Sequence, residues 1–370
     1  MTEMTFENPP KLASSLRIAV VSALEYRTPP RHTGTRELIA AILTDGLIER
    51  GHDVTLFATG DSVTRAKLRG ICPRPLREDK SLDPLVWNLL HESEVFERAH
   101  EFDVIHCHTG VSALAYAELV DTPIILTLHE TPLARQLPLF HKYARCASYV
   151  AVSDASKIPG LPYTTTIYPG VPPEEYRLNA LAGDYLLFVG TIAPNRGLET
   201  IISAAETTRV PLVIGGPVED NEYFERVIHP LAMRGGLVYL GPISTDKSSD
   251  IFGRAMALVH FSSQPQPFRF SMVQAMSCGT PVIAIRVGSN IEIVENRKSG
   301  FLVSDEEELV HAISQIRQLD RRKVRQRVVD HFSQTGMVVQ YLRVYEAAIK
   351  RAQERIRAEE VHLRGQQLIY

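Results

Sequence analysis

The sequence predicts an α/β protein with two doubly wound, Rossmann-like domains that face each other across a cleft. Short apolar segments alternate with helical segments along the chain, and this order implies parallel strands joined by right-handed crossovers. The length of 370 residues fits two domains of ordinary size better than one. A proline-rich segment at residues 168–173 separates two such series, because proline fixes φ and removes a backbone donor.

The first series begins with an apolar run at residues 16–22, which is typical of a strand covered on both faces. A helix is expected over residues 37–50, because its leucines and isoleucines recur at helical spacing, and Gly51 ends it. The expected strands of this half are 16–22, 52–58, 102–106, 123–129, 149–153 and 165–168.

The second series repeats the pattern with helices between its strands. Its expected strands are 185–189, 212–214, 237–239, 257–261 and 282–285. A last amphipathic helix is expected over 338–356 and becomes highly charged toward its end. The predicted organisation is a flexible tail at 1–15, domains at 16–170 and 171–337, and a terminal helix and tail at 338–370.

Composition narrows the function classes. The 40 Lys and Arg residues nearly balance the 43 Asp and Glu residues, which argues against nucleic acid as the main partner. Four cysteines without a CxxC pair favour a reduced, cytoplasmic protein without a zinc site, and the absence of a DxD motif gives no indication of a bound divalent ion. No signal peptide or membrane helix is expected, because no apolar run has the required length and flanks.

The loop GTIAPNRG, residues 190–197, follows a predicted strand and precedes a helix. Gly190 permits close backbone approach, and Arg196 near the helix start can hold a phosphate with two hydrogen bonds. An ordinary loop with a solvated arginine has the same sequence pattern, so this loop alone does not establish a site.

The stretch QPFRFSMVQAMSCGTPVIA, residues 266–284, predicts a helix start, a turn and a buried strand. The first-turn amides of Phe270 and Ser271 then form an anion seat at the positive end of the helix dipole. Arg269 strengthens this seat, unless it only caps a surface turn. Gln274 lies about one turn into the helix, where its amide can bond hydroxyl groups but cannot act as a base.

Three histidines stand at predicted strand ends of the first half: His106 and His108 in HCHTG, and His129 in LTLHET. A metal cluster is rejected, because no carboxylate or cysteine stands at convincing ligand spacing. His129 is the best placed for a ligand contact, whereas a structural role for His106 is an equal alternative.

From Leu16 to Lys350, the chain resembles the retaining glycosyltransferases of family four, which have the GT-B fold, and in particular a subgroup similar to bacterial antibiotic and sugar-transfer enzymes. The resemblance is carried by GHDVTLFATGDS, FDVIHCHTG, TPIILTLHE, YVAVSDASK, LVIGGPVEDNEYFERVIHPL, YLGPIS and, most densely, PFRFSMVQAMSCGTPVIAIRVGSNIEIVENRKSGFLV. The length and order of these segments are specific to the family.

The resemblance implies a nucleoside-diphosphate sugar, with UDP or GDP, held mainly by the second domain, and a small-molecule acceptor held by the first. It implies transfer with retained configuration, no metal or other cofactor, and a final helix that crosses back to the first domain. The implied catalytic residues are Arg196, Arg269 and His129. The implied donor-binding residues are Gly190, Thr191, Arg196, Gln266, Arg269, Phe270, Ser271 and Gln274; the acceptor-side residues are Arg31, His32, Thr33, Gly34, His108 and His129.

The sequence departs from the family at several of these positions. Thr191 replaces an arginine, Gln266 and Gln274 replace two glutamates, Arg269 replaces a glycine, and Gly34 stands where a double glycine is usual. Replacement of both carboxylates by an amide of the same shape argues against random decay. We interpret the site as adapted to an unusual donor or acceptor.

The leading hypothesis is therefore a glycosyltransferase with an unusual donor in specialised, antibiotic-type metabolism, with a thiol acceptor, as in lincosamide-type pathways, as one option. The alternatives are a catalytically inactive binding or regulatory partner and a phosphorylase or epimerase on the same fold. The sequence leaves the donor's sugar and base, the acceptor and the oligomeric state open.

Overall fold

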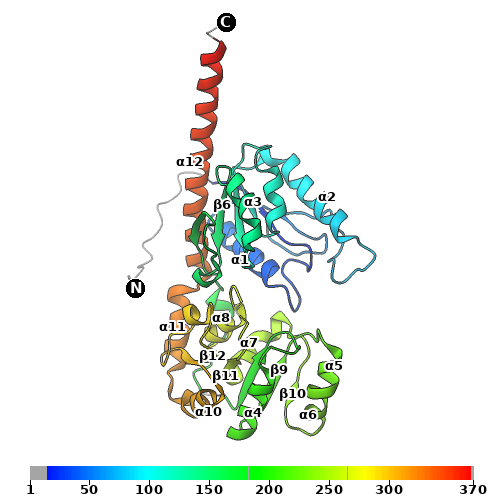
Figure 1. Ribbon diagram of the computed structural model, residues 1–370, viewed down its shortest axis with the longest axis vertical. Helices are drawn as coiled ribbons and strands as arrows, with labels where there is room; N and C mark the ends of the chain where they lie inside the picture. The colour runs from blue at the N-terminus through cyan, green and yellow to red at the C-terminus, as the bar shows by residue number, and fades with distance from the viewer. Residues whose placement is uncertain (1–14, 182, 265, 368–370) are drawn as a thin grey trace.

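The computed structural model describes residues 15–181, 183–264 and 266–367 (Figure 1). Two separate parallel sheets confirm the predicted α/β class with two Rossmann-like domains. The tail expected at 1–15 lies outside the described residues, apart from Ser15.

The first domain contains a seven-stranded parallel sheet in the order β3-β2-β1-β4-β5-β6-β7. The interior strand β1 is buried on both faces, which explains its continuous apolar run. The strands are β1 Arg17–Val21, β2 Asp53–Phe57, β3 Lys67–Arg69, β4 Val104–Cys107, β5 Ile124–Leu128, β6 Ala147–Ala151 and β7 Tyr163–Thr166, and the helices are α1 Thr35–Glu49, α2 Pro84–Glu97 and α3 Leu137–Lys142.

The second domain contains a six-stranded parallel sheet in the order β10-β9-β8-β11-β12-β13. Its strands are β8 Tyr185–Val189, β9 Leu212–Gly215, β10 Val238–Tyr239, β11 Ala255–His260, β12 Val282–Ile285 and β13 Gly300–Val303. Its helices are α4 Leu198–Thr208, α5 Asn221–Tyr223, α6 His229–Met233, α7 Thr245–Arg254, α8 Phe270–Ser277, α9 Asn290–Ile293, α10 Glu306–Gln315 and α11 Arg321–His331.

Two edge strands, β3 and β13, were not predicted. β3 has only three residues, two of which are exposed, so it lacks an apolar signal. β13 begins at Gly300, where a Cβ would lie 1.9 Å from the carbonyl oxygen of Val282, so the close strand contact requires glycine there. A glycine at a strand start resembles a loop in the sequence.

The long helix α12, Gln334–Gln367, leaves the second domain, runs along the first and extends beyond it (Figure 1). The helix begins four residues earlier than the sequence predicts. The Gln334 side chain donates a hydrogen bond of 2.7 Å to the carbonyl of Ile42 in α1. Tyr341 and Tyr345 are fully buried against the first sheet, so this helix belongs structurally to both domains.

The two domains meet at the carboxyl ends of their strands. Thr245 at the start of α7 donates its amide to the carbonyl of Arg31, at 3.1 Å. The Ser153 hydroxyl donates to the carbonyl of Pro267, at 2.5 Å. The carboxylate of Glu292 accepts from the amides of Asp154 and Ala155, at 2.9 and 2.8 Å. These bonds hold both sets of strand ends against one cleft, where α/β sheets usually bind ligands.

Candidate functional site

A cavity of about 370 Å³ lies in the cleft between the two domains. The first domain contributes the loop before α1 and the start of that helix. The second domain contributes the loops after β8, β9 and β10 and the segment that leads into α8. The lining residues are Pro30, His32, Thr33, Gly34, Thr35, Leu38, Val189, Gly190, Thr191, Arg196, Gly216, Pro217, Ile243, Thr245, Ser248, Phe252, Gln266, Phe268, Arg269, Phe270, Ser271 and Gln274.

The loop between β8 and α4 forms one wall of this cavity and depends on glycine for its shape. A Cβ at Gly216, which has φ of +144°, would lie 1.9 Å from the carbonyl oxygen of Gly190. Gly197 has φ of +76° and immediately precedes α4. Arg196, which directly precedes Gly197 in this loop, lines the cavity. Its guanidinium also lies 3.7 Å from the carboxylate of Glu219, which is outside the lining.

The segment before α8 forms the opposite wall of the second domain. The carbonyl of Gln266 accepts a hydrogen bond from the Ser289 hydroxyl at 3.1 Å, and the next carbonyl is bonded to Ser153 of the first domain. These bonds fix the backbone on both sides of the cleft. The side chains of Gln266 and Arg269 line the cavity directly before the first turn of α8.

The first turn of α8 lies at the cavity, where the sequence predicts an anion seat. The amides of Phe270 and Ser271 are the first of the helix, so they have no carbonyl acceptor within it. Arg269 occupies the N-cap position without capping the helix through its side chain. Its guanidinium is directed to the cavity instead, so the alternative of a simple surface cap does not describe it.

Burial and like charge act on Arg269 together. Burial, followed by the nearby charge of Arg196, lowers the pKa of Arg269 to about 9. Arg269 has no carboxylate within 4 Å in the described part of the chain. Two arginines therefore line one cavity, and only Arg196 has a carboxylate, that of Glu219, within 4 Å among the described residues; this arrangement favours an anionic ligand.

Gln274 lines the same cavity from the second turn of α8. Its Nε2 donates a hydrogen bond of 3.0 Å to the hydroxyl of Tyr176, a buried residue just after the interdomain linker. Burial raises the pKa of Tyr176 to about 12, so its hydroxyl stays protonated. The bond leaves the amide oxygen of Gln274 as an acceptor for a ligand hydroxyl.

His106 has a structural position. It is fully buried, and its ring nitrogens lie 2.7 Å from the hydroxyls of Tyr345 and Thr127. Burial lowers its pKa well below the usual value, so the ring is neutral. His106 therefore connects β4 and β5 to α12 and does not reach a ligand cavity.

His108 and His129 line a second cavity of about 210 Å³ in the first domain, together with Arg36, Thr109 and Glu130. The Nδ1 atom of His108 and the Nε2 atom of His129 are 2.8 Å apart. The Nε2 atom of His108 is buried and has no hydrogen-bond partner among the described residues. Burial lowers the pKa of His108 to about 3, so its ring offers uncharged hydrogen-bonding atoms to a cavity that Arg36 and Glu130 also line.

The structure groups the predicted donor-side residues in a single cavity and divides the acceptor-side residues. His32, Thr33 and Gly34 lie in the cleft cavity, His108 and His129 in the second cavity. Arg31 is exposed and contributes its backbone carbonyl to the contact with Thr245. The roles of these residues in binding and catalysis stay predictions.

Two residues near the cleft were missed by sequence reasoning. Tyr176 bonds Gln274 but follows a proline-rich linker without a recognisable motif. His260, at the end of β11, is buried beside the two arginines, and the Nε2 atom of its ring has no partner among the described residues. Only the register of the strand ends brings His260 close to this site, and the sequence does not show that register.

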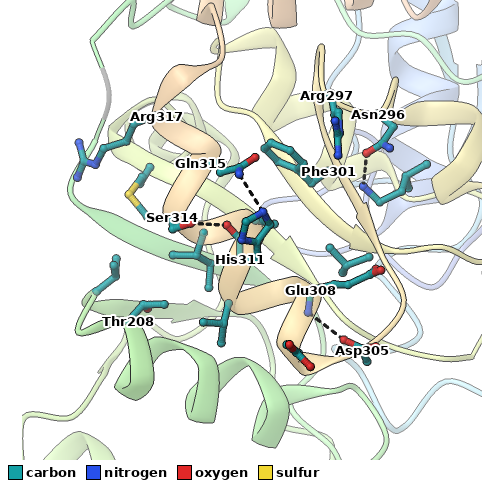
Figure 2. A pocket seen from close by; sticks show the side chains of 18 of the residues that line it. Thr208, Asn296, Arg297, Phe301, Asp305, Glu308, His311, Ser314, Gln315 and Arg317 are labelled. Carbon is teal, nitrogen blue, oxygen red and sulfur yellow. Dashed lines mark hydrogen bonds between the residues drawn. The ribbon is translucent and has the colours of Figure 1, made fainter.

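A larger groove, of about 1120 Å³, lies on another side of the second domain, around α10 and the N-terminal ends of β8 and β9. Figure 2 shows that several of its polar side chains bond within the groove: Gln315 with His311, Ser314 with the His311 carbonyl, and Asp305 with the Glu308 amide. No unpartnered buried polar atom lines it in the described part of the chain. The cleft cavity is the stronger candidate, although it is smaller, because its lining combines two arginines with the free amides of a helix start.

Among the described residues, no group of three or more His, Cys, Asp or Glu side chains is arranged to hold a metal ion. Within the same residues, no helix combines the length and the apolar character that crossing a membrane requires.

Two family models match most of the chain. The model described as Glycosyltransferase Family 4 matches residues 37–175, and the model described as Glycosyl transferases group 1 matches residues 183–318. The first match falls on the seven-stranded domain and the second on the six-stranded domain.

The chain is 25% identical to an uncharacterized glycosyltransferase of Methanocaldococcus jannaschii over 78% of this chain and 85% of that protein. It is 23% identical to a D-inositol 3-phosphate glycosyltransferase of Pseudarthrobacter chlorophenolicus over 70% of this chain and 76% of that protein.

Solved structures share the fold. AviGT4, a glycosyltransferase involved in avilamycin A biosynthesis, superposes with a TM-score of 0.68 at 21% identity, over 90% of this chain and 98% of that one. HepE of Anabaena, in complex with UDP and glucose, also gives a TM-score of 0.68, at 20% identity, over 90% of this chain and all of the other.

Proposed function

The chain is a family-four-like glycosyltransferase with the GT-B fold, and from this premise we propose that it moves a sugar from a nucleoside diphosphate in the cleft cavity to a small-molecule acceptor on the first domain, with retained configuration. The observation that carries the proposal is Arg196 in the same cavity as the first-turn amides of α8, with no aspartate or glutamate among the described residues of its lining.

This arrangement matches what the reaction requires. The leaving diphosphate gains negative charge as the sugar departs, and preoriented donors that face this charge lower the barrier. Arg196 and the amides of Phe270 and Ser271 supply such donors. Their charges come from the protein itself, so the proposed reaction is metal-independent.

The complex of HepE with UDP supports a donor that contains UDP, and a donor that contains GDP is the second option. The first domain offers the uncharged pair His108 and His129 for acceptor hydroxyl or thiol groups. A role in specialised, antibiotic-type metabolism, with a thiol acceptor as one option, is supported by the pathway of AviGT4 and stays a proposal.

Nucleotide binding tests the proposal. Thermal unfolding of the full chain is measured with millimolar UDP, GDP and ADP, in parallel with the Arg196→Ala and Arg226→Ala variants. We expect one nucleotide to raise the Tm of the native chain and of Arg226→Ala, whose arginine is 70% exposed on another part of the domain, but much less that of Arg196→Ala. Absence of stabilisation by all three nucleotides would favour the alternative of an inactive binding partner.

Product analysis then tests the chemistry. With a bound nucleotide sugar and candidate acceptors, the anomeric proton of the product in NMR gives the configuration at the transferred carbon. Retention supports the proposal, and a sugar 1-phosphate or an epimerised nucleotide sugar would identify a phosphorylase or an epimerase instead.

A further inference from the structure

The charge in the cleft cavity exceeds what a sugar nucleotide's diphosphate requires. Its lining includes two arginines, Arg196 and Arg269, and no aspartate or glutamate among the described residues. The carboxylate nearest to Arg196, that of Glu219, is 64% exposed and lies outside the lining, so solvent screens it.

The diphosphate of a sugar nucleotide carries one negative charge on each phosphate. Arg196 supplies one positive charge, and the N-termini of α1 and α8 each supply about half a charge. Both helix starts line the cavity, through Gly34 and Thr35 and through Phe270 and Ser271. These three features already balance the diphosphate, so Arg269 remains without an anion.

The position of Arg269 indicates which part of the ligand it faces. The donor sugar has to lie between the diphosphate and the domain that holds the acceptor. The segment 266–269 occupies this place, because Ser153 of the first domain bonds the carbonyl of Pro267 while α8 begins at residue 270. Gln266 and Arg269 from this segment both line the cavity.

The chemistry of these two side chains fits an anion better than a neutral sugar. A carboxylate is the strongest acceptor for sugar hydroxyls, and the lining offers amides in its place. A guanidinium matches a carboxylate with two parallel hydrogen bonds, and the Gln266 amide can donate a third. A largely buried arginine without a partner is costly unless a ligand provides the anion.

We propose that the transferred sugar carries a carboxylate, as in a glycuronic acid, which Arg269 and Gln266 bind at the sugar end of the cleft; this inference rests on the proposed function. Arg269 then selects the donor sugar, while Arg196 and the start of α8 hold the diphosphate.

Isothermal titration of the full chain measures the affinities for UDP, UDP-glucose and UDP-glucuronic acid, with GDP, GDP-mannose and GDP-mannuronic acid as the matched set. For the base that binds, we expect the acidic sugar nucleotide to bind at least tenfold more tightly than the neutral one. In Arg269→Gln this ratio is expected to fall to within about twofold, whereas UDP or GDP alone keeps its affinity. Arg226→Ala is the matched control and keeps the native ratio.

The outcomes separate the two levels of the proposal. Equal affinity of the native chain for the acidic and neutral sugar nucleotides would overturn the carboxylate assignment and leave the nucleotide site intact. Loss of UDP or GDP affinity in Arg269→Gln would overturn it as well, because Arg269 would then be a diphosphate ligand. If none of the six compounds binds, the proposed function itself fails.

Discussion

Arg269 of the second domain and His108 of the first line two separate cavities, and burial affects the charge of these two side chains differently. Desolvation lowers the pKa of Arg269 only to about 9, so its guanidinium stays charged at neutral pH. Desolvation lowers the pKa of His108 to about 3, so the imidazole is neutral. The difference follows from the ordinary pKa values of the two side chains, since the physical cause is the same.

This contrast explains how one fold can present two kinds of binding surface. In the proposed reaction, the arginines of the second domain supply positive charge for a diphosphate, and the neutral rings of His108 and His129 in the first domain supply hydrogen-bonding atoms for an acceptor molecule. Because the histidines are neutral, they do not compete with the arginines for the diphosphate. This difference favours a single orientation of the donor in the cleft.

The largest expected effect is a loss of activity when the charge of Arg196 in the second domain is removed. Arg196→Ala should lower kcat/KM for sugar transfer about 100- to 1,000-fold, because it removes a preoriented charge from the leaving diphosphate. Steady-state kinetics with the cognate donor give the measurement. The Arg226→Ala variant, which lacks a far more exposed arginine, should keep a kcat/KM close to the native value. An equal loss in both variants would show that the effect does not depend on the position of Arg196 in the cleft.

A buried carboxyl beneath the cleft loop gives the second effect. Glu37 of α1 is 2% exposed and accepts a hydrogen bond from the Tyr26 amide, and burial raises its pKa to about 7 from 4.5. The folded chain then binds more protons than the unfolded chain between these values, so Glu37 makes the free energy of unfolding fall as pH rises from about 4.5 to 7. Glu37→Gln should remove this contribution and stabilise the fold above pH 7 by up to about 3 kcal/mol.

Urea unfolding at pH 4.5, 6 and 8 measures this difference between the native chain and Glu37→Gln. Equal stability differences at all three pH values would mean that folding does not change the pKa of Glu37. Exposed Glu222→Gln serves as the control and should leave the pH profile unchanged.

The neutral histidines of the first domain predict a smaller effect, on acceptor binding rather than on nucleotide binding. His129→Ala should raise the acceptor KM about tenfold, the value of roughly one good hydrogen bond, and leave the affinity for nucleotide unchanged. Titration with UDP or GDP separates the two steps. A loss of nucleotide affinity comparable with that of Arg196→Ala would contradict the division between the domains. His229→Ala, on the surface of the second domain, is the matched control.

The smallest effect refines the position of Gln274. Tyr176→Phe removes the hydroxyl that accepts from its Nε2 and should change nucleotide affinity by only about two- to threefold, because the amide can find water instead. Calorimetric titration detects this change. An effect above tenfold would mean that Tyr176 itself contacts the ligand.

The repeated strands and the helix at residue 270 could be predicted because their apolar periods are set by burial, which leaves a direct trace in the sequence. The grouping of the expected donor-side residues around one cavity could be predicted for a related reason. They lie in two loops that each follow a strand, so local order places them at one sheet edge.

The remaining features depend on contacts between distant segments. The Tyr176–Gln274 bond joins residues 98 positions apart, and the His106–Tyr345 contact joins residues 239 apart. Neither leaves a periodic signal. The separation of His129 from the cleft cavity also depends on how the loops of the first domain fold, and spacing along the chain does not report it.

The interdomain linker and the segment before α12 lie side by side. The amide of Val171 donates to the carbonyl of Phe332 at 2.9 Å, and the amide of Gln334 donates to the carbonyl of Val171 at 2.7 Å. At Gly170 a Cβ would lie 2.3 Å from the carbonyl oxygen of Ser333, so only glycine allows this approach.

Both covalent connections between the halves therefore act as one pivot. Rotation of the domains about this pivot would separate Thr245 from the loop before α1, and it would break the hydrogen bonds that the Thr245 amide and hydroxyl donate to the carbonyls of Arg31 and Pro30. A larger residue at Gly170 would push the two crossings apart and shift the resting angle of the molecule without altering any group in the cleft.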